Sequence, residues 1–183
     1  AKPVKTDVGQ LLKNGKKYYF FTYATVGIHA AVFHNIDTRL KKRFGRLAFW
    51  ESGLRTLWQK SRLPRFLLTM QELSEGQEQP AEIRDYGYSF TLSNVANYAG
   101  YGTFTNDRPA LPGAFELHTF RRNKVMPMLT WFAVQRLFGI DREQPQNGVN
   151  IRRVNKVHVH SHRHLSVQTD GEPLRPKSKD LTF

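Results

Sequence analysis

Apolar and polar positions along the chain predict a mainly β structure. Segment 17–26 is dense in aromatic and β-branched residues and stops at Gly27, which predicts one strand buried on both faces or nearly so. Segments 65–70 and 86–92 read as strands separated by a polar linker at 74–80, so we expect them to form a hairpin. A strand of alternating character is predicted at 114–120, after a glycine-punctuated loop, and further strands between residues 154 and 167.

Two other segments carry a helical period. Between residues 37 and 62, apolar residues recur at helical spacing, Asp37 can cap the start, and Pro64 lies just beyond the end. A second helix is predicted at 127–139, with Pro127 in its first turn and Gly139 at its end. At least six strands and two helices predict a single domain over residues 1–183, with a β-sandwich-like architecture decorated by helices.

Composition narrows the class of protein. The 183 residues, 39% of them hydrophobic, suffice for one buried core, and the lack of cysteine excludes disulfides and thiolate metal sites. No stretch approaches the roughly 20 apolar residues of a membrane span, and the first residues hold no apolar run like a signal peptide. We therefore expect a cytoplasmic protein, soluble or peripheral to a membrane.

The net charge of +13 is unevenly distributed. Residues 1–62 hold 13 Lys/Arg and 3 acids, residues 63–120 hold 3 and 7, and residues 121–183 hold 12 and 5. Such a chain suits an anionic partner: phospholipid headgroups, nucleic acid or the acidic face of a protein. The basic side of the 37–62 helix is either a solvated surface or a membrane-binding one, and no recognised motif supports nucleic acid. Its candidate lipid-binding residues are Lys41, Lys42, Arg43 and Arg46.

Four histidines alternate along one segment. If the segment is extended, His158, His160, His162 and His164 share one face of a strand, where they could bind zinc or copper or form a polar, lipid-facing surface. Neighbours at i and i+2 are about 6.5–7 Å apart, and no carboxylate lies between them. Nearby Arg and Lys side chains also oppose a cation, so we predict no metal site.

Asp170, Gly171 and Glu172 place two carboxylates around a glycine. An Asp-Gly pair favours an ordinary hairpin turn, but one carboxylate of such a turn could also orient a hydroxyl while the other holds a helper group. Elsewhere in the chain, no Gly-rich loop follows a strand and opens a helix, so no cradle for nucleotide phosphates is visible. By itself, the chain is not expected to transfer phosphate from ATP.

Read in order, four segments resemble the C-terminal domain of the diacylglycerol kinase-like lipid kinases, which include sphingosine and ceramide kinases. A glycine-and-small-residue turn at 27–30 is followed by a Lys-Lys-x-x-Gly-x-x-Ala-aromatic run at 41–49. An asparagine-to-glycine-rich loop covers 94–102, with Pro109 and Ala110 after it. Segment 111–117 stands where the family has Asp-Gly-x-Leu, and 170–173 matches the terminal Asp-Gly-Glu. The resemblance spans about residues 7 to 174.

This resemblance implies a function that the residues alone do not give. It implies a β-sandwich that packs against an N-terminal nucleotide-binding domain, absent from this chain, with the lipid entering between them. ATP and Mg²⁺ would be bound mainly by that domain, and the substrate would be a diacylglycerol-like or related lipid hydroxyl. By the same likeness, Glu172 is the candidate general base and Asp170 its neighbour. Asn94, Gly100 and Gly102 belong to the substrate loop.

The chain departs from the family at two points. The aspartate of Asp-Gly-x-Leu, which helps to hold Mg²⁺ in bacterial members, corresponds to Pro112, and proline has no carboxylate. The family's Gly-Gly-Asp-Gly-Thr segment has no counterpart here, and the returning C-terminal segment looks cut short after Phe183. An alternative function is therefore a peripheral membrane or lipid-binding module with the same fold and no catalysis.

Overall fold

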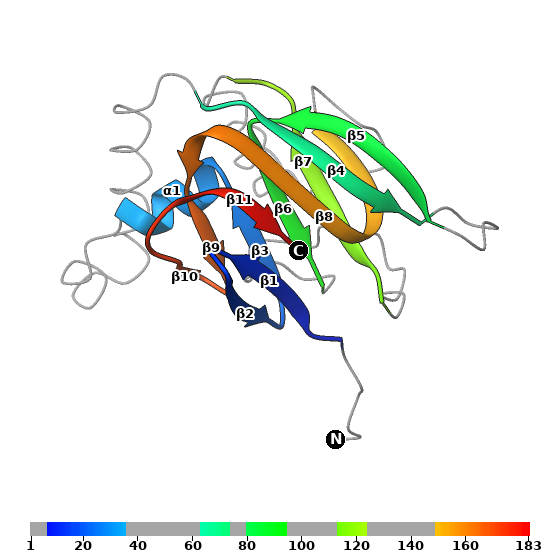
Figure 1. Ribbon diagram of the computed structural model, residues 1–183, viewed down its shortest axis with the longest axis horizontal. Helices are drawn as coiled ribbons and strands as arrows, with labels where there is room; N and C mark the ends of the chain where they lie inside the picture. The colour runs from blue at the N-terminus through cyan, green and yellow to red at the C-terminus, as the bar shows by residue number, and fades with distance from the viewer. Residues whose placement is uncertain (1–6, 36–62, 74–79, 95–112, 124–148) are drawn as a thin grey trace, which may run out of the picture.

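A computed structural model describes residues 7–35, 63–73, 80–94, 113–123 and 149–183 (Figure 1). The helices predicted at 37–62 and 127–139 lie outside these residues. The described part holds one helix, α1 (Ile28–Asn35), and eleven strands. The strands are β1 (Gly9–Lys13), β2 (Lys16–Phe20), β3 (Tyr23–Val26), β4 (Phe66–Glu72), β5 (Ala81–Gly87), β6 (Ser89–Ser93), β7 (Phe115–Phe120), β8 (Val149–Leu165), β9 (Val167–Thr169), β10 (Glu172–Pro173) and β11 (Ser178–Thr182).

Within the described ranges, all strand pairs are antiparallel and join into one curled sheet. Its main path runs β10-β9-β3-β6-β7-β8-β11-β1-β2, and β4 pairs with both β8 and β5 beside that path. The 17-residue strand β8 sweeps across the molecule in Figure 1, so that its first part pairs with β7 and its later part with β4 and β11. The prediction of a mainly β chain is therefore confirmed.

The curl folds the sheet into two layers around one core. We call β9, β3, β6 and β7 the covered layer, and β5, β4, the later part of β8, β11, β1 and β2 the open layer. Aromatic rings join the layers: Phe66 meets Phe90 at 5.8 Å between ring centroids, and Phe20 meets Phe115 at 5.6 Å. The hydrophobic core contains side chains of both layers, which gives the molecule its sandwich-like interior.

The outward surfaces of the two layers differ sharply. In the covered layer, Thr25, Thr91 and Gln168 alternate with core residues and are nevertheless 0% exposed. Helix α1 packs on part of that surface, against β3, β9 and β10. In the open layer, Leu67 is 55% exposed and Leu12 40% exposed. The outward surface of the covered layer is therefore buried at these positions, whereas that of the open layer faces solvent.

The strand predicted at 17–26 is wrong as a single element. The chain bends at Phe21 and Thr22, so that β2 lies at one end of the sheet path and β3 near the other. The whole segment has high β propensity, but the Asp170 carboxylate, 149 residues away in sequence, accepts a hydrogen bond from the backbone N–H of Phe21. A tertiary contact has overridden a local preference here.

Other sequence predictions are met in part. The linker at 74–80 joins β4 to β5, so a hairpin forms, but the strand predicted at 86–92 divides into the end of β5 and most of β6. The strand predicted at 114–120 is confirmed as β7. The turn expected at 27–30 is wrong beyond Gly27, because helix α1 begins at Ile28. Strand β11 was not predicted from the sequence.

Candidate functional site

The tripeptide at 170–172 forms the tight turn between β9 and β10. Glu172 pairs with Thr169 across the turn, and the two central residues have positive φ angles of 47° at Asp170 and 86° at Gly171. Two positive φ values in a two-residue hairpin are the signature of a type I′ turn, for which Asp-Gly is a preferred sequence. The turn predicted from the Asp-Gly pair is confirmed.

The Asp170 carboxylate fastens this turn to the bend between β2 and β3. Its Oδ2 accepts the backbone N–H of Phe21 at 2.7 Å. Its Oδ1 accepts the N–H of Thr22 at 2.9 Å, the Thr22 hydroxyl at 2.5 Å and the N–H of Tyr23 at 3.1 Å. Both oxygens are engaged, so this side chain closes the curled sheet where β2 passes into β3.

These contacts set the charge state of Asp170. Partial burial by itself raises the pKa of this carboxyl, but the hydrogen bonds from the Thr22 side chain and from the N–H groups of Phe21, Tyr23 and Thr22 outweigh it and hold the pKa below its usual value. An ionised carboxylate that already accepts four hydrogen bonds is poorly suited to take another proton. The geometry favours Asp170 as a positioning residue.

Asn94 holds the same bend from the other side. Its side-chain Nδ2 donates to the carbonyls of Phe21 at 3.0 Å and Asp7 at 2.6 Å, and its backbone N–H donates to the Thr22 carbonyl at 2.8 Å. The residue is 4% exposed. The structure thus brings Asp170 and Asn94, which are far apart in sequence, to one short segment. Both Nδ2 hydrogens are used within the protein.

A buried amide supports the turn from below. Gln168 accepts the Gly171 N–H at 2.7 Å through Oε1 and donates through Nε2 to the Thr25 hydroxyl at 3.0 Å. The aromatic side chains of Phe33 and Tyr23 also lie close to Gly171. Sequence reasoning missed Gln168 and Thr22, and no local pattern could have found them, because their roles depend on partners distant in the chain.

Glu172 is the exposed carboxylate of this arrangement. It begins β10 and its side chain faces solvent. Among the described residues it forms no ion pair and accepts no hydrogen bond that would occupy its oxygens. The turn therefore offers one carboxylate locked in place and one beside it that is open to a ligand.

The described residues do not fit a Mg²⁺ site. Within the described ranges, no three His, Cys, Asp or Glu side chains converge as metal ligands do. Asp170, the carboxylate nearest to Glu172 in sequence, has both oxygens bonded to protein donors. The four histidines of β8 do share one exposed face, as predicted, but His160 pairs with Asp180 and His158 meets the Thr182 hydroxyl.

Several predicted site residues fall outside the described part of the chain. They are Lys41, Lys42, Arg43 and Arg46 of the proposed lipid-binding helix, Gly100 and Gly102 of the substrate loop, and Pro112. None of the described helical residues forms a span able to cross a bilayer. Lipid contact through Lys41 to Arg46 and through the glycines stays a prediction.

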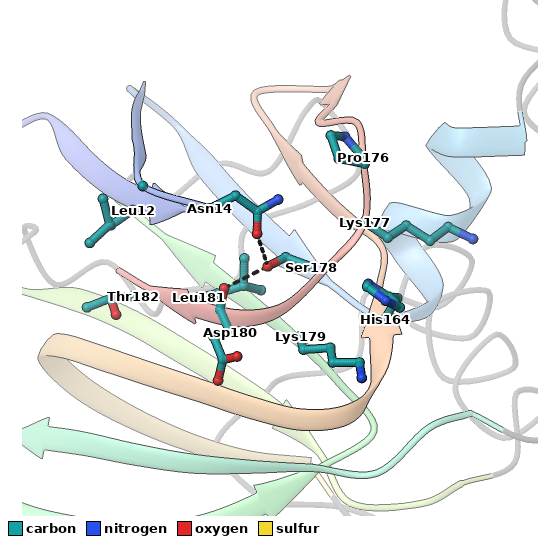
Figure 2. Close-up of a pocket in the computed structure, with 11 residues that line it drawn as sticks. Leu12, Asn14, His164, Pro176, Lys177, Ser178, Lys179, Asp180, Leu181 and Thr182 are labelled. Atoms are coloured by element: carbon teal, nitrogen blue, oxygen red, sulfur yellow. Dashed lines mark hydrogen bonds between the residues drawn. The ribbon is translucent and has the colours of Figure 1, made fainter.

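A separate hollow of about 630 Å³ opens between the β1–β2 turn, the end of β8 and β11. Figure 2 shows Asn14 and Ser178 facing one another, with Lys177, His164 and Lys179 along one side. The Ser178 hydroxyl lies 2.8 Å from Asn14 Oδ1 and 2.8 Å from the Asp180 carbonyl. The remaining lining residues are Leu12, Gly15, Pro176, Asp180, Leu181 and Thr182.

Comparison with known proteins gives a likeness of fold. No protein-family model and no curated protein sequence matches the chain. Among solved structures, a "putative diacylglycerol kinase" from Bacillus anthracis str. Sterne superposes with a TM-score of 0.57 and 16% identity, over 97% of this chain and 54% of that one. A second structure of a protein so described gives a TM-score of 0.53, 16% identity, and coverage of 97% and 53%.

The chain spans about half the length of the structures that it matches. At 16% identity the likeness establishes the fold alone. The resemblance that the ordered sequence segments predicted is therefore confirmed at the level of architecture: this chain has the fold of one half of the diacylglycerol kinase-like structures.

Proposed function

We propose that this chain is the substrate-side half of an ATP-dependent lipid kinase that phosphorylates a hydroxyl of diacylglycerol or a related lipid. The observation that carries the proposal is the turn at Asp170 and Gly171, clamped to the Phe21–Tyr23 bend while Glu172 stays open. The shared fold with structures described as diacylglycerol kinases supports it. ATP and Mg²⁺ are assigned to a nucleotide-binding part outside this chain.

In this proposal Glu172 accepts the proton of the lipid hydroxyl. The hydroxyl oxygen bonds to the γ-phosphorus of ATP while the bond between that phosphorus and the ADP oxygen breaks, and the proton moves to the Glu172 carboxylate. Phosphoryl transfer depends more on positioning than on strong basicity, so a carboxylate that takes the proton late is adequate. Asp170 and Gln168 serve as positioning residues, because they fix the turn that carries Glu172.

The test uses the full-length protein, which this proposal requires to include a phosphate-binding domain encoded upstream of Ala1. Phosphate transfer from ATP to diacylglycerol in mixed micelles gives kcat and KM. We expect Glu172→Gln to lower kcat about 100-fold or more, since general bases contribute about 10²–10⁴-fold. The matched control is Glu82→Gln, which removes another exposed carboxylate, in β5, and should leave kcat unchanged. A Glu172→Gln enzyme with unaltered kcat overturns the role.

The alternative is a lipid-binding module without catalysis, and the observation that favours it is Pro112 in place of the family's metal-binding aspartate. A protein of this kind binds lipid vesicles but transfers no phosphate even at full length. The same assay separates the two functions, because complete inactivity of well-folded, full-length wild-type protein supports the module and excludes the kinase.

A further inference from the structure

The exposed large apolar side chains gather on one side of the molecule. Among the described residues, seven such side chains are exposed. One of them, Ile151, does not belong to the open layer, because it lies in the first part of β8 and pairs with His118 of β7. The other six belong to open-layer strands or to the residues beside them: Val8, Leu12, Tyr19, Phe21, Leu67 and Tyr86. Grouped exposed apolar residues mark surfaces that contact something other than water.

Strand register places these residues among the histidines of β8. Leu67 of β4 stands between Tyr86 on one side and His160 on the other, and His160 is followed by Asp180 of β11. In the adjacent row, His158 is flanked by Thr69 and Thr182, and Thr182 pairs with Leu12. Side chains opposite one another in a sheet are close neighbours, so apolar and imidazole groups are interleaved across this outward surface.

The same surface carries an excess of positive charge. Its exposed cations include Lys17, Arg84, Lys156, Lys177 and Lys179, and its exposed acids are Glu82 and Asp180. Both acids already have partners: Glu82 lies 3.9 Å from Arg84, and Asp180 contacts His160. The lysines are therefore the charges that this surface offers to a ligand.

The hollow shown in Figure 2 opens on this surface. Leu12, Asp180 and Thr182 line the hollow and also belong to the rows described above. Lys177, Lys179 and His164 stand along its side. A concave site with two ammonium groups and an imidazole suits a phosphate-bearing group of modest size.

From these observations we infer that the outward surface of the open layer is a docking face for membranes that contain anionic phospholipids, and that the hollow receives a lipid headgroup. Aliphatic side chains among cations match a bilayer surface, where apolar groups enter the acyl boundary and lysines meet anionic headgroups. A second copy of the chain would oppose one positive surface with another, which costs free energy. The docking face is a binding site and does not depend on Glu172 acting as a base.

Docking on this face also brings the candidate site to the membrane. Phe21, which is 58% exposed, follows β2 at the edge of the docking face, and its backbone N–H is held by Asp170. The turn that carries Glu172 thus adjoins the bilayer surface when the face is occupied. A lipid substrate would have only a short distance to travel between the membrane and the turn.

The experiment is co-sedimentation of the 183-residue chain at pH 7.5 with vesicles of 3:1 phosphatidylcholine and phosphatidylserine, and with pure phosphatidylcholine. We expect binding only to the anionic vesicles. Lys177→Glu with Lys179→Glu should weaken binding by about tenfold or more. Leu12→Ser with Leu67→Ser should weaken it by about fivefold or more.

The matched control is Ile151→Ser, which removes an exposed apolar side chain of similar size and should leave binding unchanged. Circular dichroism of each variant verifies the fold. Equal binding to neutral vesicles, or binding untouched by the leucine and lysine variants, overturns the docking face. A dimer in sedimentation equilibrium that Leu67→Ser dissociates would instead assign the surface to a second copy. Kinase activity is not measured here, so failure of this test leaves the proposed function standing.

Discussion

Histidines occupy the two layers of this molecule in opposite ways. His29 of α1 is half-buried, and its ring meets that of Phe120 in the covered layer at 5.7 Å between centroids. The four histidines of β8 are exposed on the open layer. Burial lowers the pKa of His29 to about 4, because the protonated ring would lose its hydration. The same residue type thus serves as a neutral packing group beside the covered layer and as an exposed polar surface on the open layer.

The contrast extends to the candidate site. Polar side chains of the covered layer form hydrogen bonds within the protein: Gln168 bonds to Thr25 and to the turn at Gly171. Polar side chains of the open layer, such as the histidines of β8, are instead exposed to solvent. The covered layer therefore acts as a scaffold that positions Glu172, whereas the open layer is built for contact. Substitutions in the two layers should accordingly affect different measurements.

The largest expected effect is on a glycine that joins the covered layer to α1. Gly27 has a φ of +97°, and an added Cβ would lie 2.6 Å from the Tyr88 carbonyl oxygen. We expect Gly27→Ala to lower the free energy of unfolding by about 3–4 kcal/mol, measured by urea denaturation. Gly15, in the open layer's β1–β2 turn, has a φ of +74° with nothing nearby, so Gly15→Ala should cost only about 1 kcal/mol. Equal costs would contradict the contrast.

The second prediction concerns acid sensitivity. Above about pH 6.5, His29 is neutral in both the folded and unfolded states and has no effect on the pH dependence of stability. As pH falls from 6.5 toward about 4, His29 binds a proton in the unfolded chain but not in the folded chain. The free energy of unfolding therefore decreases, by about 3 kcal/mol in all. Denaturant titrations at several pH values should show this slope, and His29→Leu should remove it.

The control for that slope is the open layer. The triple variant His158→Gln, His160→Gln and His162→Gln should retain the loss of stability between pH 6.5 and 4, because these rings are exposed. If the triple variant flattens the profile and His29→Leu does not, the roles of the two layers are reversed.

The smallest effect is expected at the clamp. The lowered pKa of Asp170 means that its contribution to stability is present above the unfolded pKa of about 3.9 and is lost as pH falls through the lower folded value. Because the side chain is partly exposed, Asp170→Asn should cost only about 1 kcal/mol at pH 7. The difference from wild type should shrink in acid below about pH 4. A difference that grows in acid would show that the carboxylate is not held ionised.

Much of the fold could be read from the sequence. Alternation located β7, the Asp-Gly pair located the turn at 170 and 171, and the spacing of His158 to His164 placed their side chains on one face. Helix α1 was missed because it has only eight residues and no apolar stripe separates it from the strand before it. The short strands β1, β10 and β11 were missed because few residues carry their pattern.

The candidate site was harder to predict than the fold. The tripeptide could be singled out, but its division into a locked Asp170 and an open Glu172 depends on donors supplied by Phe21, Thr22 and Tyr23. The sequence around residue 170 does not indicate those partners, because they lie almost 150 residues away. The same contacts broke the strand predicted at 17–26, so one long-range clamp explains both the error in the fold and the geometry of the site.

The most direct measurement is the single-turnover rate of phosphate transfer from ATP to vesicle-borne diacylglycerol by the full-length protein, with vesicle binding measured on the same samples. Our account predicts that Glu172→Gln lowers this rate about 100-fold or more and leaves vesicle binding unchanged. Leu12→Ser with Leu67→Ser should do the reverse, weakening vesicle binding while the rate at saturating vesicles is preserved. A Glu172→Gln protein that transfers phosphate at the wild-type rate would contradict the central claim.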